Sequence, residues 1–159
     1  MEEAILYAKK YLEDMLSFFG LNTDVHATIS DEGDVIELSV PSTHLNGFLI
    51  GHNGETMRSL QFLTSSSLSN NNFSTTRVNV DIADYKKQRA ERLTHHALSW
   101  VEEVKKSNQP MDLEPMNAAD RRVIHKLAAE HGLTSESAGE GRDRHIVLGP
   151  SSSITEEKD

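Results

Sequence analysis

Two short groups of residues in this 159-residue chain have types and spacings that suit anion binding, and the first is Gly51-His52-Asn53-Gly54. Its two glycines bracket a two-residue loop between two predicted helices. Because glycine has no Cβ, the backbone can turn sharply there and approach a ligand closely. The loop leads into a helix whose first N–H groups and positive dipole end favour phosphate. The pattern predicts a loop that holds a phosphate backbone, with a tight helix–helix turn as the structural alternative.

The second group is an arginine and a histidine four residues apart, Arg121 and His125, in a segment with helical spacing over residues 118–131. At this separation two side chains share one face of a helix. The guanidinium offers a planar fork of donors, and the imidazole can stack or donate to a phosphate. The pair therefore predicts a phosphate contact. The alternatives are that Arg121 pairs with Asp112 or Glu114 and that His125 bonds to backbone.

Three further arginines accompany this pair. Arg122 follows Arg121 directly, and Arg142 and Arg144 precede a segment of β-branched character, His145–Leu148, that is typical of a strand. If the strand starts early, Arg142 and Arg144 project from one face because they are two residues apart. We therefore expect two strand arginines beside a helical Arg/His pair to form a phosphate cradle.

The elements that position the glycine loop follow from periodicity and turn residues. Apolar residues at helical spacing, alternating segments and a Glu32-Gly33 turn predict this order: a helix over 2–19, strands over 25–30 and 35–40, a short helix capped at 41–43 that runs into Ile50, a helix over 56–69 and a strand over 77–82. Apolar residues on both sides of the loop, Ile50, Met57 and Leu60, are expected to anchor its flanks in a core. The order is helix, strand, strand, helix, loop, helix, strand.

The second half begins with a long helix over about 85–106, and a break around Pro110 separates it from the helix that carries Arg121. Asn117 is a suitable N-cap for that second helix, and Asp120 stands three residues later in a position like that of a capping box. A basic cluster at the start of the long helix is interpreted first as a solvated face; its members are Lys86, Lys87, Arg89 and Arg92.

Charge is divided unevenly along the chain. The net charge is −9, and residues 1–84 hold 4 Lys and Arg against 12 Asp and Glu, whereas residues 85–150 hold 11 against 10. Since phosphate binding depends on local patches, the second half is the better candidate, and the acidic first half is expected to bind weakly and in a salt-sensitive manner. Few exposed aromatic side chains are expected, so stacking on bases should contribute little.

Other classes of chemistry fit poorly. Without cysteine the chain has no disulfide, thiolate metal site or cysteine nucleophile, which is compatible with the cytoplasm. The glycine loop lacks the Gly-Lys-Ser/Thr ending of a nucleotide-binding P-loop, and no HExxH or nucleophile-elbow pattern occurs. We expect no enzyme activity, no cofactor and no metal. There is neither a secretion signal nor an apolar run of about 20 residues to span a membrane.

Several motifs in one order give the chain a family resemblance. Arg121-x-x-x-His125 looks like the RxxxH signature of a small single-stranded nucleic-acid-binding domain, and the motifs that surround it are Leu113–Asn117, Ser135–Arg142, Ile50–Gly54, Leu60–Leu63, Val80–Tyr85 and Arg89. Together they resemble the bacterial Jag family (SpoIIIJ-associated proteins, also called KhpB or EloR), which joins a KH domain to an RxxxH domain. The similarity covers roughly residues 1–149.

The resemblance implies an α+β fold of two domains. Residues 1–84 would form a type II KH domain, a three-stranded sheet with helices on one face, and residues 85–150 a small α+β RxxxH domain. The polar segment 151–159 is expected to be a disordered tail. By carry-over, Gly51, His52, Asn53 and Gly54 would hold the RNA backbone. Arg121 and His125 would be the contact pair of the second domain, supported by Arg122, Arg142 and Arg144.

The function implied is that of a cytoplasmic bacterial protein that binds single-stranded RNA, a post-transcriptional regulator linked to cell elongation and division. Its expected partners are RNA and either a small single-KH protein or a second copy through the KH domain. The alternative is a protein-interaction adaptor, in which the acidic KH face binds a basic partner or another KH domain and RNA contact is incidental.

Two departures from the family pattern bear on these expectations. Many members carry a basic residue in the glycine loop, whereas this chain has His52-Asn53. Because histidine is mostly neutral at pH 7, the first domain should bind RNA weakly, or more tightly at mildly acid pH. Equal His52-dependent affinity at about pH 6 and pH 8 would exclude that hypothesis. Many relatives also have an extra N-terminal domain; this chain starts at the KH helix, so roles tied to that domain are not expected.

Overall fold

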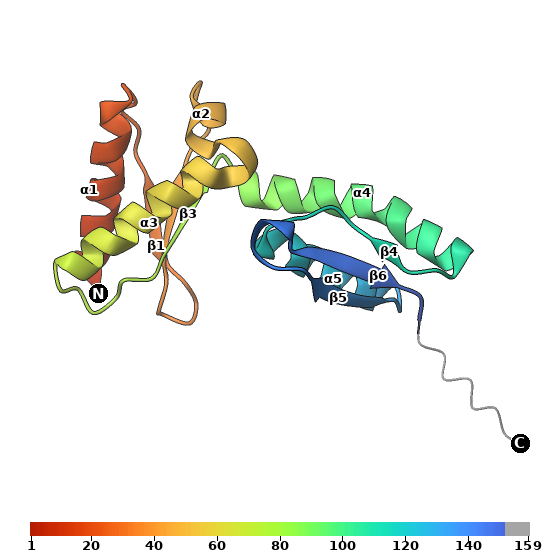
Figure 1. Ribbon diagram of the computed structural model, residues 1–159. Coiled ribbons are helices and arrows are strands. Elements are labelled where there is room, and N and C mark those ends of the chain that lie inside the picture. Colours follow the sequence, from red (N-terminus) through yellow and green to blue (C-terminus); the bar gives the residue numbers. More distant parts are fainter. Residues whose placement is uncertain (152–159) are drawn as a thin grey trace, which may run out of the picture. The chain divides into compact units, whose positions relative to one another are not determined.

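The computed structural model describes residues 1–151, and it divides the chain into two compact units, Met1–Lys86 and Lys87–Asp159 (Figure 1). We call these the first and the second unit. The predicted disordered tail lies, apart from Ser151, outside the described residues. Each unit has its own hydrophobic core and its own three-stranded sheet, so the chain is a mixed α+β protein.

The first unit has the element order predicted from the sequence: α1 (Glu2–Phe18), β1 (His26–Ile29), β2 (Ile36–Val40), α2 (Asn46–Ile50), the 3₁₀ turn η1 (His52–Gly54), α3 (Glu55–Asn70) and β3 (Val78–Ile82). Helix α2 starts later than its predicted cap at 41–43. The Asn46 side chain accepts a hydrogen bond from the Thr43 backbone N–H, and the Thr43 hydroxyl accepts one from Leu45. These bonds hold a turn in place of a first helical turn.

The sheet of the first unit has the order β1-β2-β3, in which β2 pairs antiparallel with β1 and parallel with β3. Three register pairs of β2 and β3 are buried: Ile36–Val78, Leu38–Val80 and Val40–Ile82. Alternation puts these six side chains on one face, where they form a core with residues of α1 and α3, including Leu12, Leu16, Met57, Leu60 and Leu68. The helices therefore cover one face of the sheet, and the β2–β3 crossover carries residues 51–54, which we call the GxxG loop.

The second unit contains α4 (Tyr85–Ser107, which begins two residues before the boundary), β4 (Met111–Asp112), α5 (Ala118–Glu130), β5 (Thr134–Ala138), the 3₁₀ turn η2 (Gly141–Asp143) and β6 (His145–Gly149). Both strand pairs of its sheet, ordered β4-β6-β5, are antiparallel. Its core joins side chains of α4, α5 and the sheet: Ala97, Val101, Val104, Leu113, Ile124, Leu127, Ala128, Ile146 and Leu148.

The prediction that Arg142 and Arg144 share one strand face was wrong. Strand β6 starts only at His145, while Arg142 lies in η2 and Arg144 lies between η2 and the strand. Gly139 explains the early turn, since its φ is +78° and an added Cβ would lie 2.7 Å from the Asp143 carbonyl oxygen. The chain doubles back there, and the two arginines belong to the turn.

Asn117 caps α5 as predicted, its side-chain oxygen accepting a hydrogen bond of 2.9 Å from the Asp120 N–H. The expectation of a capping box was wrong, because the carboxylate of Asp120 is buried and accepts hydrogen bonds from Arg89 of α4. The Arg89 Nε donates at 3.0 Å and the Nη2 at 2.6 Å. This two-point ion pair links the two helices of the second unit.

Within residues 1–151, no helix has the length and apolar character needed to cross a membrane. The same part of the chain has no group of three or more histidine, aspartate and glutamate side chains arranged to hold a metal ion.

Candidate functional site

The GxxG loop is built by backbone geometry. Gly51 has φ +71° and ψ −175°, a region that only glycine adopts readily, and Gly54 has φ +79°. A Cβ on Gly51 would lie 2.2 Å from the Thr56 hydroxyl oxygen and 2.9 Å from the Thr56 backbone nitrogen. On either side, Ile50 is half-buried and Met57 is buried, as predicted for its anchors. The loop is thus a fixed turn in which Gly54 is buried, Gly51 is half-buried and the two residues between them face solvent.

The tip of this loop offers polar groups to solvent. His52 and Asn53 are both exposed, and the Asn53 amide lies 3.1 Å from the His52 ring Nε2. Asn53 takes a left-handed conformation, φ +50°, which asparagine tolerates better than most residues. The N-cap residue of α3 is Gly54, which has no side chain to accept a hydrogen bond from the first N–H groups of the helix. These N–H groups therefore lie beside the loop with the positive end of the helix dipole.

Arg58 is a residue of this site that the sequence interpretation missed. Its Nη1 donates a hydrogen bond of 2.8 Å to the Asn53 carbonyl, so a guanidinium lies at the tip of the loop. The signal was its position four residues after Gly54, which brings the side chain one helical turn back toward the loop. Arg58 is exposed and thus supplies a cation next to a loop that has neither lysine nor arginine at positions 52 and 53.

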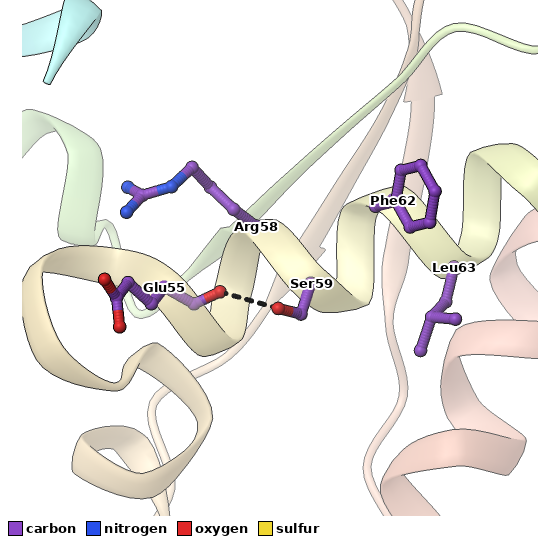
Figure 2. Close-up of a pocket in the computed structure, with 5 residues that line it drawn as sticks. All are labelled: Glu55, Arg58, Ser59, Phe62 and Leu63. Carbon is purple, nitrogen blue, oxygen red and sulfur yellow. Dashed lines mark hydrogen bonds between the residues drawn. The ribbon is translucent and has the colours of Figure 1, made fainter. Parts of the chain in front are cut away.

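The solvent-facing side of α3 is partly apolar. A shallow hollow there is lined by Glu55, Arg58, Ser59, Phe62 and Leu63 (Figure 2). Phe62 is 69% exposed and Leu63 45% exposed. The expectation of few exposed aromatics was wrong, since four of the five phenylalanines are exposed: Phe18, Phe19, Phe48 and Phe62. All four belong to the first unit.

Two residues of the predicted basic cluster at the start of α4 bond to different partners. The ammonium group of Lys86 donates to the Asn79 side chain, and desolvation lowers the pKa of Lys86 although Asp81 and Glu37 oppose that shift. Arg89 instead bonds to Asp120. Lys86 and Arg89 thus each bond to a residue of their own unit. The other two members of the cluster, Lys87 and Arg92, are exposed.

In the second unit, Arg121 is half-buried and its Nη1 donates a hydrogen bond of 2.8 Å to the Met116 carbonyl. The Met116 N–H in turn donates to the Arg144 carbonyl at 3.1 Å, so the segment that holds Arg121 is joined to the one that carries Arg144. The alternative in which Arg121 pairs with Asp112 or Glu114 is not formed within the described residues. One bond to Met116 leaves other donors of the guanidinium fork to meet an anion.

His125 has a hydroxyl at each ring nitrogen. Its Nδ1 lies 2.7 Å from the Ser135 Oγ, and its Nε2 lies 3.2 Å from the Ser137 Oγ. The alternative that His125 bonds to backbone was therefore wrong. Both serines belong to β5, two residues apart, and so share the strand face that α5 packs on. Sequence reasoning missed them because it did not predict β5; their alternation around Glu136 was the available signal.

The remaining predicted arginines, Arg122, Arg142 and Arg144, are exposed. His145 stabilises the turn that carries Arg142 and Arg144. Its Nδ1 lies 2.8 Å from the Asp143 carbonyl, and its Nε2 lies 3.2 Å from an Asp112 carboxylate oxygen. The Asp143 carbonyl first, and the Asp112 carboxylate with it, raise the pKa of His145 because both stabilise the imidazolium. The charged ring can donate to both acceptors at once.

Comparison with known proteins finds a domain family that matches part of the second unit and relatives that align with most of the chain. Residues 91–150, which include Arg121 and His125, match the family of RxxxH domains, also written R-3-H domains. The chain is 29% identical over 149 residues to the RNA-binding protein KhpB of Bacillus subtilis, which is 92% of this chain and 70% of that protein. It is 28% identical to the RNA-binding proteins KhpB of Clostridium symbiosum and Streptococcus pneumoniae, covering 89% and 92% of this chain but 64% and 43% of theirs. The chain thus spans less than two thirds of the latter two relatives.

Proposed function

We propose that this protein binds single-stranded RNA through two surfaces, the GxxG loop of the first unit and the Arg121/His125 face of the second. The observation that carries the proposal is the Arg121/His125 pair, held on one face of α5 inside the segment that matches the RxxxH domain family. The relatives, which align with nearly the whole chain, are named RNA-binding proteins, and this supports RNA as the nucleic acid.

In this proposal the first unit, over about residues 1–84, is a type II KH domain. The support is its element order, the parallel β2–β3 pair and the position of the GxxG loop in the crossover between those strands. Gly51, His52, Asn53 and Gly54 hold the RNA backbone, since KH domains clamp a few nucleotides at such a loop. Arg58 adds a cation at the same place.

The second unit, over about residues 85–150, is the RxxxH domain of the proposal. Arg121 donates to a phosphate with the part of its guanidinium not used by Met116, and His125 completes the contact pair. Arg122, Arg142 and Arg144 are supporting phosphate contacts, which suits their exposure. No cofactor and no catalysis are part of the proposed function.

The wider role follows from the resemblance to the Jag family. We place the protein in the cytoplasm, as a post-transcriptional regulator linked to cell elongation and division. Its protein partner would be a small single-KH protein or a second copy of the chain. The relatives' names support the RNA part of this role.

Fluorescence anisotropy with short single-stranded RNA at several salt concentrations tests the proposal. Two double variants assign the surfaces, His52→Asp/Asn53→Asp for the loop and Arg121→Ala/His125→Ala for α5; the first keeps both glycines and so spares the backbone turn. We expect the α5 variant to lose about tenfold or more in affinity and the loop variant less, because the first unit is acidic.

Lys105→Ala is the matched control, since it removes one exposed charge near the end of α4, outside either surface. It should change affinity by less than the α5 variant at every salt concentration. Micromolar wild-type protein that fails to bind RNA, or binding that neither double variant weakens, would contradict the proposed function.

The exposed apolar side of α3 favours a second candidate, a protein-interaction adaptor. Phe62 and Leu63 leave apolar surface in contact with water, and such surface often marks a protein contact. Sedimentation velocity over a range of concentrations tests this candidate. Self-association that Phe62→Ser abolishes, in a protein that does not bind RNA, would favour the adaptor over the RNA-binding protein.

A further inference from the structure

The structure assigns a phosphate-binding role to Ser135 and Ser137, with His125 as the residue that orients their hydroxyl groups. This inference rests on the proposed RNA binding of the second unit and deepens it. It changes the role of His125, because each ring nitrogen already has a serine hydroxyl within hydrogen-bond distance. The direct donors to the phosphate would then be Arg121 and the serines.

The two ring nitrogens of His125 restrict where the serine hydroxyl hydrogens can point. In a neutral imidazole one ring nitrogen donates and the other accepts. One serine must then donate its hydroxyl hydrogen to the ring, while the other accepts from the ring and keeps its own hydrogen. In an imidazolium both nitrogens donate, so both serines accept and both keep their hydrogens. In either state at least one hydroxyl hydrogen is directed away from His125, whichever tautomer is present.

The location of the serines suits a phosphate. They lie at half-buried positions of β5, a strand at the edge of the sheet order β4-β6-β5. Within the described residues, both hydroxyls lie within hydrogen-bond distance of the His125 ring, at 2.7 and 3.2 Å. Arg121 lies one helical turn from His125, so its guanidinium belongs to the same face of α5 as the ring that contacts the serine pair. One cation and at least one oriented hydroxyl are a common donor set for a phosphate oxygen.

A hydroxyl contact and a charge contact respond differently to salt, and this difference makes the inference testable. Each cation that neutralises a phosphate contributes about one to the slope of log affinity against log salt. A neutral hydroxyl releases no counterion and leaves that slope unchanged. Removing the serines should therefore lower affinity at all salt concentrations equally, whereas removing Arg121 should lower both affinity and slope.

The experiment is anisotropy with short single-stranded RNA on the full chain, comparing Ser135→Ala/Ser137→Ala, Ser135→Thr/Ser137→Thr, His125→Ala and Arg121→Ala. We expect the alanine pair to lose about three- to tenfold in affinity with an unchanged salt slope. The threonine pair keeps the hydroxyls and suits a strand, so it should restore most of that affinity. Thr134→Ala is the control, a hydroxyl of the same strand on the opposite face.

A double-mutant cycle tests the positioning role of His125. If the histidine acts through the serines, His125→Ala added to the serine alanine pair should cost much less than it does in wild type. His125→Ala should also leave the salt slope unchanged. A slope reduced by about one, as in Arg121→Ala, would show a direct charge contact by His125 and overturn the inference.

The outcomes separate the inference from the function on which it rests. Weaker binding by Arg121→Ala together with unchanged binding by the serine alanine pair would overturn the inference and leave the RNA-binding proposal standing. Unchanged binding by Arg121→Ala and by the serine pair would overturn both for the second unit. Loss in the alanine pair that the threonine pair does not reverse, at an unchanged unfolding midpoint, would also overturn it, because the hydroxyls would not be the cause.

Discussion

The two units build their candidate contacts by different means. In the first, the GxxG loop owes its shape to backbone conformation at Gly51 and Gly54, and the side chains at its tip are exposed. In the second, hydrogen bonds hold half-buried side chains: Arg121 donates to the Met116 backbone carbonyl, and His125 lies between two serine hydroxyls. The shape of the first surface should therefore depend on the two glycines and not on the side chains at the tip, whereas the second surface should be sensitive to each member of its network.

The two units also differ in net charge. Residues 1–86 carry 5 Lys and Arg against 12 Asp and Glu, a net of −7, while residues 87–150 carry 10 of each. Phosphate is repelled by the first unit as a whole, and only a local feature such as the helix end with Arg58 favours it there. The second unit presents a neutral background to the same ligand. We conclude that the second unit should contribute most of the affinity for RNA, whereas the first unit should mainly position the RNA backbone at its loop.

The largest effect should come from Gly51→Ala, which places a side chain at a backbone conformation that favours glycine. We expect the free energy of unfolding of the first unit to fall by about 3 kcal/mol or more. The φ/ψ region of Gly51 is restricted to glycine, and the new Cβ would clash with Thr56. Chemical denaturation monitored by circular dichroism measures the change. Gly33→Ala is the control, since its φ is +74° with nothing within 4 Å of the added Cβ. It should cost about 1–2 kcal/mol, and equal losses would show that the Thr56 contact is not restrictive.

The matching change in the second unit is Asp120→Ala, which leaves the guanidinium of Arg89 without its carboxylate. We expect a loss of about 2–3 kcal/mol in the free energy of unfolding, because Asp120 is buried and accepts two-point donation. Denaturant unfolding of the variant and of Glu102→Ala, an exposed acid on α4, measures it. A cost in Asp120→Ala no larger than that in Glu102→Ala would refute the structural role of the ion pair.

A smaller effect is expected at the tip of the GxxG loop. Arg58→Ala removes the hydrogen bond to the Asn53 carbonyl and the cation beside the loop. RNA affinity should fall about two- to fivefold, with a salt slope lower by up to about one. Anisotropy over a salt series checks both quantities. Arg77→Ala, an exposed arginine of the same unit that pairs with Asp34, is the control and should leave the slope as it is in wild type.

The smallest effect concerns pH and should be confined to the second unit. The raised pKa of His145 means that its stabilisation is fully present below the pKa of about 6.5 that histidine has in the unfolded chain. This stabilisation is lost as pH rises through the higher value in the folded chain. The unfolding midpoint of wild type should therefore exceed that of His145→Gln at about pH 5.5, and the difference should shrink by about pH 8.5.

An NMR titration of the histidine rings gives the independent measurement of that prediction. The His145 resonance should titrate with a pKa above the ordinary histidine value of about 6.5. A pKa at or below that value, or a difference between wild type and His145→Gln that grows with pH, would exclude the proposed pair of bonds to Asp143 and Asp112.

The elements of the first unit could be predicted because their signals are local. Its strands alternate, its long helices have apolar stripes, and the turn at Gly33 and the loop at Gly51 are marked by glycine. The exposed phenylalanines could not be predicted, since periodicity indicates which face of a helix is apolar but not where that face is left uncovered. Phe62 has the same residue type as a core side chain and is 69% exposed.

The elements of the second unit were harder to predict from the sequence, because they depend on contacts between distant residues. Strand β5, Thr134–Ala138, has polar residues at four of its five positions and is a strand because it pairs with β6. Strand β4 has only two residues and likewise depends on β6. The bond between Asp120 and Arg89 joins residues 31 positions apart, so the local capping pattern was misleading. The spacing of Arg121 and His125 indicated the face correctly, but the serines that contact His125 come from the strand that was missed.

The parallel pairing of β2 with β3 has a consequence for the order in which the first unit can form. Strands β1 and β2 meet through a short turn, whereas Ile36 must find Val78 across the whole α2–η1–α3 segment. Closing so long a loop is slow compared with forming a hairpin or a helix. During synthesis the glycine turn emerges from the ribosome well before β3. Until Ile82 has been made and paired, the nascent chain carries residues 51–54 without the sheet that aligns their two flanking helices.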